Sequence, residues 1–384
     1  MFNGPLRVGF HLPQVVLEPS MTAFVDSCVQ TVAGSAGAVV RRSRGHPPAR
    51  KLLRAVAHKR NILVTTHEHP DPDALASALG LSTLFGAMMP GVTVSISVKG
   101  RIGGGLNEAF ARQAHLNLVP WDDAALADYD AIILVDTQPL FAYSPLPHTV
   151  APTAVIDHHR TRGRRPACAF FDVRPDVGAT ASIIFSYFME LEVPPSPDLA
   201  AVLLFAIESD LAGAARTPGE LDNVALSTLT LRANPAKLYR MRYVDLTQSY
   251  YIAYAAALTN AAYYDYAILS HLDTIDSLEK PAVMADFLLR FDKACWSLVT
   301  AVHESRLILS LRTSDTRLSA ADMMPRLLRN LGEGGGHRTK AGGFIPLETG
   351  SAAEIDRLRK ILRRRYLRAL GISCSRGQRL LAAG

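Results

Sequence analysis

The sequence predicts an α/β protein with a doubly wound parallel sheet in its first domain, joined by a helical linker to a smaller α/β domain. Short apolar, β-prone runs alternate with helical patterns over residues 61–210, which favours parallel strands with helices on both faces of the sheet. The runs at 131–135 and 154–156 are continuously apolar, as is typical of parallel strands buried on both sides. At 384 residues the chain also exceeds the size of one hydrophobic core.

The individual elements are predicted from the period of the apolar residues. A period of two, or a short unbroken apolar run, indicates a strand, and apolar residues three or four apart indicate a helix. Strands are predicted at 61–64, 92–98, 131–135, 154–156, 266–269, 296–302 and 307–311. Helices are predicted at 73–84, 176–191, 199–207, 247–261, 320–331 and 352–370.

Domain boundaries follow from changes in composition. Residues 1–46 include a stretch of small residues and a basic run, which are typical of a flexible segment. A tyrosine-rich helical stretch separates the two groups of strands. The expected segments are therefore a flexible lead at 1–46, a first domain at 47–240, a helical linker at 241–265, a second domain at 266–371 and a loose tail at 372–384.

Charge and cysteine content limit the functional class. The net charge of +6 permits a phosphate-bearing partner without requiring one. The four cysteines show no CxxC spacing, so neither a disulfide framework nor a zinc knuckle is indicated and a reduced, cytoplasmic location is expected. No apolar run reaches the length needed to span a bilayer, so no membrane partner is expected.

The loop after the first strand carries candidate metal ligands. His67, Asp71 and Asp73 lie within seven residues, and Pro70 and Pro72 exclude regular structure between them. Two carboxylates held this close repel each other and need solvent or a cation. The alternative is a helix cap within a solvated acidic loop.

Further acids and imidazoles follow other buried elements. Asp136 ends one predicted strand, Asp157, His158 and His159 end the next, and Asp210 follows an apolar helix. Strand ends at the carboxyl edge of a parallel sheet are where ligands bind in such folds, so these side chains are expected to converge with the first loop. A surface loop with chance histidines is the alternative for the two imidazoles, and Glu208 competes with Asp210.

The expected ligand set favours two hard divalent cations. It consists of His67, Asp71, Asp73, Asp136, His158 and Asp210. Oxygen-rich sites with one or two imidazoles suit Mn²⁺, or Mg²⁺ as a second choice, better than structural Zn²⁺. Six ligands exceed what one such ion needs, whereas two ions sharing a carboxylate account for the number.

The second domain carries candidate anion-binding residues. Gly334, Gly335 and Gly336 precede His337 and Arg338, and glycines let a backbone approach an anion closely. The nearby Lys340, and Arg312 at the end of a predicted strand, add positive charge. The alternatives are a flexible turn for the glycines and a solvated strand end for the arginine.

These motifs, in this order, resemble the DHH phosphoesterase family, and the glycine-rich run resembles its DHHA1 domain. The resemblance implies that His67, Asp71 and Asp136 hold one Mn²⁺ and that Asp73, Asp136, His158 and Asp210 hold the other, with Asp136 bridging. It also implies that Asp136, Asp157 and His159 act in catalysis: His159 faces the scissile phosphate and Asp157 orients its neighbours. His337 and Arg338 bind the nucleotide. Leu211 and Ala212 depart from the family's usual sequence after the last metal acid.

The compact layout is similar to nanoRNA hydrolases that also act on pAp. It implies a Mn²⁺-dependent enzyme that hydrolyses short RNA or DNA oligonucleotides, pAp or dinucleotides such as pApA to mononucleotides, through a hydroxide bridging the ions. A homodimer is one expected assembly. The alternatives are an inorganic pyrophosphatase or exopolyphosphatase, a RecJ-type single-strand exonuclease, and a nucleotide-binding scaffold without activity.

Overall fold

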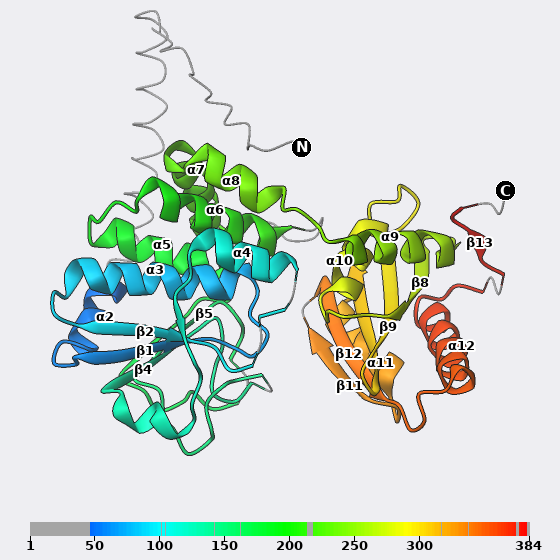
Figure 1. Cartoon of the computed structure of the whole chain (residues 1–384), viewed down its shortest axis with the longest axis horizontal. Coiled ribbons are helices and arrows are strands. Elements are labelled where there is room, and N and C mark those ends of the chain that lie inside the picture. The colour runs from blue at the N-terminus through cyan, green and yellow to red at the C-terminus, as the bar shows by residue number, and fades with distance from the viewer. Residues whose placement is uncertain are drawn as a thin grey trace, which may run out of the picture.

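The computed structural model describes residues 47–100, 102–103, 105–141, 143–161, 163–212, 218–315, 317–336, 338–373 and 376–381. Within them the chain forms two sheets, each with its own hydrophobic core, lying side by side (Figure 1). The first sheet is wholly parallel and the second is mixed. The predicted α/β class is therefore confirmed.

The first sheet has the strand order β3-β2-β1-β4-β5-β6. Its strands are β1 (Asn61–Thr65), β2 (Thr93–Ser97), β3 (Leu118–Val119), β4 (Ala131–Val135), β5 (Ala154–Asp157) and β6 (Phe170–Val173). The order reverses direction between β1 and β4. In an open parallel sheet such a reversal leaves a crevice at the carboxyl ends of the two strands, where ligands bind.

Helices cover one face of this sheet. They are α2 (Pro48–Ala55), α3 (Pro72–Met88), α4 (Leu106–Ala114), α5 (Thr180–Glu190), α6 (Pro197–Leu211), α7 (Glu220–Arg232) and α8 (Pro235–Arg242). Their apolar side chains form one core with Ile62, Val64, Ile133 and other strand residues that point to this face.

The opposite face differs from the expectation of helices on both sides. Its smaller core, around Leu63, Leu134 and Val155, is covered by the 3₁₀ helix η1 (Ala124–Asp128) and by loops. The connection from β4 to β5 contains four prolines within residues 136–153, and proline interrupts regular helix. This face is therefore closed by irregular chain.

The second sheet has the order β11-β12-β10-β9-β8-β7-β13. Its strands are β7 (Ala262–Tyr264), β8 (Ala267–Thr274), β9 (Trp296–His303), β10 (Arg306–Thr313), β11 (Glu333–Gly336), β12 (Lys340–Pro346) and β13 (Gln378–Arg379). Helices α9 (Gln248–Asn260) and α10 (Lys280–Leu288) pack on one face, and α11 (Ala320–Leu328) and α12 (Ala352–Ala369) pack on the other.

The end of the chain is more ordered than the predicted loose tail. Gln378 and Arg379 form β13 and pair with β7, and Ile372 is buried in the core beneath α12. The helix α12 is long but strongly basic. In the part of the chain that the structure describes, no helix is both long enough and apolar enough to cross a membrane.

The glycine-rich run forms a strand rather than the expected anion-binding turn. Gly334 and Gly343 are cross-strand partners on β11 and β12, and both approach Leu328 of α11. A Cβ at Gly334 would lie only 2.6 Å from Leu328 Cδ1, closer than packed carbon atoms approach each other. These two glycines allow the helix to pack tightly against the sheet.

We expect Gly343→Ala to destabilise the second domain, whereas Gly342→Ala should not. A Cβ at Gly343 would overlap Leu328 and lie 2.8 Å from the Glu333 carbonyl oxygen, but one at Gly342 would meet its first neighbour at 3.7 Å. Overpacking of this kind costs about 1–3 kcal/mol in the free energy of unfolding. Urea unfolding of both variants measures the difference, and equal midpoints would contradict this packing.

Candidate metal centre

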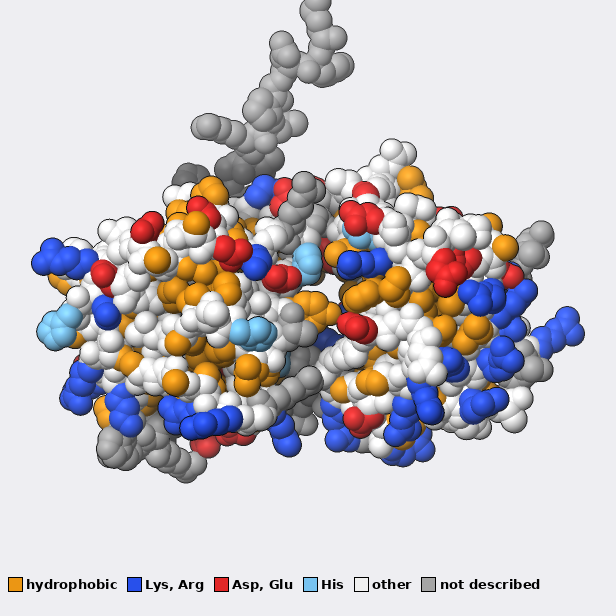
Figure 2. All heavy atoms as spheres, turned by 90° about the horizontal axis from the view of Figure 1, so that it is seen from below, with side chains coloured by type: hydrophobic (Ala, Val, Ile, Leu, Met, Phe, Trp, Pro, Cys, Tyr) orange, Lys and Arg blue, Asp and Glu red, His pale blue; other side chains and the backbone are white. Residues whose placement is uncertain are grey.

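The predicted ligands lie in a cleft between the two sheets. The cleft encloses about 2420 Å³ and is lined by both domains; Figure 2 shows the hollow between the two halves of the molecule. Its floor is the carboxyl edge of the first sheet, where the loop after β1 meets the end of β4. The site therefore occupies the crevice where the strand order reverses.

Acids and imidazoles from distant segments converge there in three overlapping groups. Within each group, the possible ligand atoms lie within 4.8 Å of one another. The groups are His67, Asp71 and Asp136; Asp136, His158 and His159; and Asp73, His158 and Asp210. Asp136 and His158 each belong to two groups, so the described geometry brings all six predicted ligands into one continuous cluster.

Asp136 lies at the centre of this cluster. Its carboxylate is 3.5 Å from Nε2 of both His67 and His158, one on each oxygen. Thr180 donates its hydroxyl to the same carboxylate at 2.7 Å. The backbone of Asp136 has φ of 56°, a left-handed conformation that aspartate tolerates better than most residues.

Asp73 is held by the N-terminus of a helix. Its two carboxylate oxygens accept the backbone N–H groups of Thr180 and Ala181 at 2.7 and 2.8 Å. These are the first residues of α5, where unpaired N–H groups and the helix dipole stabilise negative charge. The carboxylate is therefore fixed although it is almost completely buried.

Hydrogen bonds to the backbone orient the two histidines that face acids. His67 Nδ1 lies 2.8 Å from the Glu68 carbonyl oxygen, and His158 Nδ1 lies 3.2 Å from that of Val177. A ring that donates from Nδ1 presents Nε2 as a lone pair, which is the arrangement of most metal-binding histidines. In both rings Nε2 faces the carboxylate cluster.

His159 is oriented differently, by Asp157. The fully buried Asp157 accepts both the ring Nδ1 and the backbone N–H of His159, at 2.7 and 3.1 Å. Gln138 donates its side-chain amide to Asp157 at 2.7 Å and to the His159 carbonyl oxygen at 3.0 Å. Asp157 thus positions His159, and Gln138 fixes both.

The electrostatics of the pocket favour bound cations. Burial, followed by the charges of Asp136 and Asp210, raises the pKa of Asp73 well above its usual value. Burial lowers the pKa of His67, but the hydrogen bond and charge of Asp136 outweigh it and raise that pKa to about 9. Burial opposes ionisation of Asp136, but the neighbouring histidines lower its pKa overall. Carboxylates and imidazoles in this proportion fit Mn²⁺ or Mg²⁺.

Comparison with known proteins agrees with this geometry. Residues 61–207 match the N-terminal domain of the DHH family. The chain belongs to the DHH family. An exopolyphosphatase-related protein from Bacteroides fragilis has a similar structure, with a TM-score of 0.66 over 84% of this chain and 97% of that one, at 18% identity. At that identity the likeness concerns the fold.

Two curated relatives differ in how much they cover. The uncharacterized protein MJ1633 of Methanocaldococcus jannaschii is 32% identical over 82% of this chain and 65% of its own length. The manganese-dependent inorganic pyrophosphatase of Bacillus subtilis is 28% identical over 39% of this chain and 47% of its own length. The chain thus spans between about half and two thirds of the length of these relatives.

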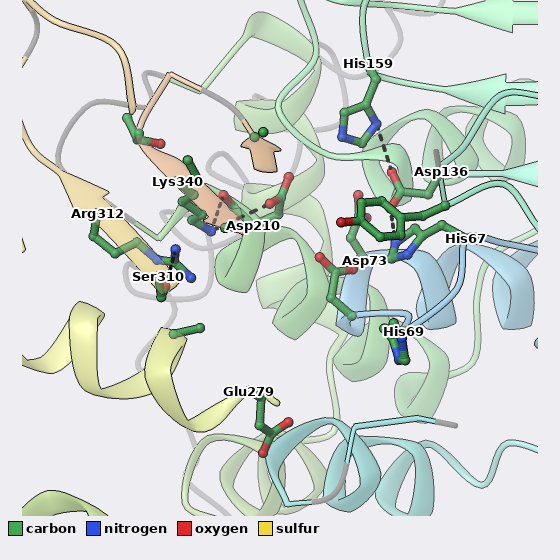
Figure 3. Close-up of a pocket in the computed structure, with 18 of the residues that line it drawn as sticks. His67, His69, Asp73, Asp136, His159, Asp210, Glu279, Ser310, Arg312 and Lys340 are labelled. Carbon is green, nitrogen blue, oxygen red and sulfur yellow. Dashed lines mark hydrogen bonds and ion pairs between the residues drawn. The ribbon is translucent and has the colours of Figure 1, made fainter. Parts of the chain in front are cut away.

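The second domain brings positive charge to the DHH cluster. Lys340 Nζ lies 3.7 Å from Asp210 Oδ1 and 3.4 Å from the carbonyl oxygens of Ser209 and Asp210 (Figure 3). Arg312 also lines the cleft and donates to Asp286 at 2.9 Å. Arg338 lines the cleft with its side chain exposed, and His337 lies outside the described residues.

Glu208 does not compete with Asp210. Its carboxylate pairs with Arg242 of α8, whereas Asp210 lies 3.6 Å from His158 Nε2. The two acids are only two residues apart on α6, so they point to different sides of the helix.

Three supporting residues were not predicted from the sequence. Gln138 and Thr180 contact the cluster directly, and the buried Asp222 accepts the backbone N–H groups of Gly178 and Gly219 at 2.7 and 2.8 Å. Gln138 lies two residues after Asp136, which is a weak signal. Thr180 and Asp222 are helical polar residues with no local signal, because their roles depend on chain more than forty residues away.

A second contact between the domains lies beside the metal loop. Glu279, at the start of α10, accepts the backbone N–H groups of Leu106 and Asn107 at 2.7 and 3.3 Å, and Tyr250 donates to it. Asn107 in turn donates to the Pro70 carbonyl oxygen at 3.3 Å. The second domain therefore caps α4 and, through it, contacts the loop that carries Asp71.

We expect Mn²⁺ to stabilise the folded chain through Asp136. A cation that binds only the folded state should raise the free energy of unfolding by about 2.7 kcal/mol at 100 times its Kd. Asp136→Asn keeps the left-handed backbone but removes the central charge, and should lose most of this gain. Glu208→Gln, which removes an acid paired outside the cluster, should keep it. Equal stabilisation of both variants in thermal unfolding would contradict this site.

We also expect a pH dependence of stability from Glu279. Burial raises its pKa to about 7 from 4.5, despite the two N–H donors. The folded chain therefore holds a proton that the unfolded chain releases, and the contribution is full below pH 4.5 and is lost as the pH rises to about 7. Glu279→Gln should flatten this part of the curve in urea unfolding. An unchanged slope in the variant would show that the dependence has another source.

Proposed function

We propose that this chain is a metal-dependent phosphoesterase that hydrolyses short oligonucleotides and small nucleotides such as pAp or pApA. One observation carries the proposal. Four carboxylates and two imidazoles form a continuous cluster at the crevice of the DHH domain, and Lys340 reaches this cluster from the opposite domain. An anionic substrate needs both a cation site and a cationic wall, and this cleft offers both.

The cluster would hold two divalent ions in the sets expected from the motifs. His67, Asp71 and Asp136 would bind one, and Asp73, Asp136, His158 and Asp210 the other. Mn²⁺ is preferred because the Bacillus subtilis relative is a manganese-dependent enzyme, and Mg²⁺ is the alternative. Such ions lower the pKa of bound water and neutralise phosphate oxygens when they are present.

The remaining residues would position the phosphate and exclude water. His159, held by Asp157 and Gln138, lies in the cleft 3.7 Å from Asp136 and would face the scissile phosphate. Lys340 and Arg312 would neutralise charge that develops on its oxygens. The predicted roles of Gly334, Gly335, Gly336, His337 and Arg338 in holding the nucleotide stay predictions, as do the homodimer and the cytoplasmic location.

An inorganic pyrophosphatase or exopolyphosphatase is the second candidate, because relatives with these names share the fold or part of the sequence. The size of the cleft favours a nucleotide. At about 2420 Å³ it exceeds the roughly 300–1000 Å³ of common small-ligand pockets. Pyrophosphate would leave most of this space filled with water, whereas a short oligonucleotide would contact both domains.

A substrate panel with Mn²⁺ tests the proposal. We expect turnover of pAp and of di- to pentanucleotides, and none of pyrophosphate at equal concentration. Asp136→Asn should abolish turnover, and His159→Asn should lower kcat by about 100-fold, the usual effect of losing a positioned polar group at the transition state.

The Glu208→Gln variant serves as the control in the same panel and should retain wild-type rates. Consumption of pyrophosphate or polyphosphate alone would exclude the nucleotide substrate while leaving the metal centre in place. Turnover by Asp136→Asn at the wild-type rate would exclude the metal-dependent reaction itself.

A further inference from the structure

Part of the second sheet faces the cleft without a helix over it. Helices α9 and α10 cover β8 and β9 through a core that includes Ile268, Val299 and Ala301. The same face of the sheet continues onto β10, β12 and β11, where its residues line the cleft. The buried Leu307, Leu309 and Leu311 of β10 point to the other face.

The strand register arranges this open face in rows. Arg312 is paired with Lys340; Ser310 with Gly342, which is paired with Gly335; and Ile308 with Phe344, which is paired with Glu333. Arg306 lies at the far end of β10, opposite Pro346. The row nearest the metal cluster is therefore charged, the next has almost no side chains, and the third is apolar and aromatic.

Packing does not explain the glycines of the middle row. A Cβ at Gly335 would meet no atom within 4 Å, and one at Gly342 would meet only the Leu309 carbonyl oxygen at 3.7 Å. Gly334 and Gly343, which alternate with them, face α11 and are required by its close approach. The middle row is thus a flat floor that the fold itself does not need.

The far end of the face offers a stacking surface. The Arg306 guanidinium lies 4.7 Å from the centre of the Phe344 ring, and the ring is only partly buried. Aromatic rings and arginine planes are the groups on which proteins stack nucleobases. The Glu333 carboxylate at the same level would repel a further phosphate but can accept a sugar hydroxyl.

The spacing of the rows limits what can reach this surface. Rows two residues apart along a strand are about 7 Å apart, so Phe344 lies about 13 Å from the charged row and Arg306 about 20 Å from Arg312. A nucleotide held by its phosphate at Lys340 and Arg312 would cover the glycine floor. Only a second nucleotide would extend to Phe344 and Arg306.

We propose that Arg306, Ile308 and Phe344 form a subsite for the base of a second nucleotide, with Gly335 and Gly342 as the floor beneath the first. This inference rests on the proposed phosphoesterase function and selects the substrate class within it. A linear dinucleotide or short oligonucleotide fills the face, whereas pAp and pyrophosphate leave the stacking surface unused.

The test compares pApA, pAp and pyrophosphate with Mn²⁺ in the full chain. Phe344→Ala should lower kcat/KM for pApA by about tenfold, mainly through KM, in keeping with the usual effect of removing a base-stacking aromatic residue. Arg306→Met should act in the same direction, and Phe344→Trp should restore the rate. All three should leave kcat/KM for pAp unchanged.

A second variant keeps the test independent of lost packing. Gly342→Leu adds a side chain over the open floor and should raise KM for pApA without lowering the thermal midpoint, since its Cβ has space. Arg357→Met, which removes an exposed arginine of α12, is the matched control for Arg306→Met.

The outcomes separate the two proposals. Equal losses on pApA and pAp, or no loss on either, would overturn the subsite. A selective loss on pApA supports it. A wild-type chain that consumes pyrophosphate and neither nucleotide would overturn the proposed function, whatever the variants do.

Discussion

Mutual repulsion among buried carboxylates is the constraint on which the rest of this structure depends. Asp71, Asp73, Asp136 and Asp210 meet in a pocket that excludes most solvent, and burial and their shared charge oppose the ionisation of Asp71 and Asp73. The fold answers this in three ways. The N-terminus of α5 binds Asp73, histidines approach Asp136, and Lys340 approaches Asp210 from the other domain. Divalent cations would supply the remaining positive charge.

The second domain contributes contacts that the DHH domain cannot make alone. Lys340 reaches the edge of the metal cluster, Glu279 caps α4 beside the metal loop, and the open face of β10 and β12 forms the opposite wall of the cleft. Because each domain has its own core, their relative position depends on such polar contacts. The cleft is therefore closed by interactions that can form and break without unfolding either domain.

Sequence reasoning succeeded where a signal is local. Continuous apolar runs located β4 and β5, and the acids that follow them lie at the cluster. It failed where distant chain decides: the short β6 carries little periodicity, and the proline-rich connection gave no sign that it would cover the second face of the sheet in place of helices. The glycine run suggested a turn, but pairing with β12 made it strand β11.

The sequence by itself determined which chemical groups this protein can offer and their order along the chain, because side-chain chemistry and strand-end position are local properties. Only the tertiary structure decided which groups share a pocket, how Asp157 and Gln138 orient His159, and which glycines face α11 or the cleft. Those outcomes depend on strand register and domain packing, and a one-residue change of register would turn every side chain of a strand to the opposite face.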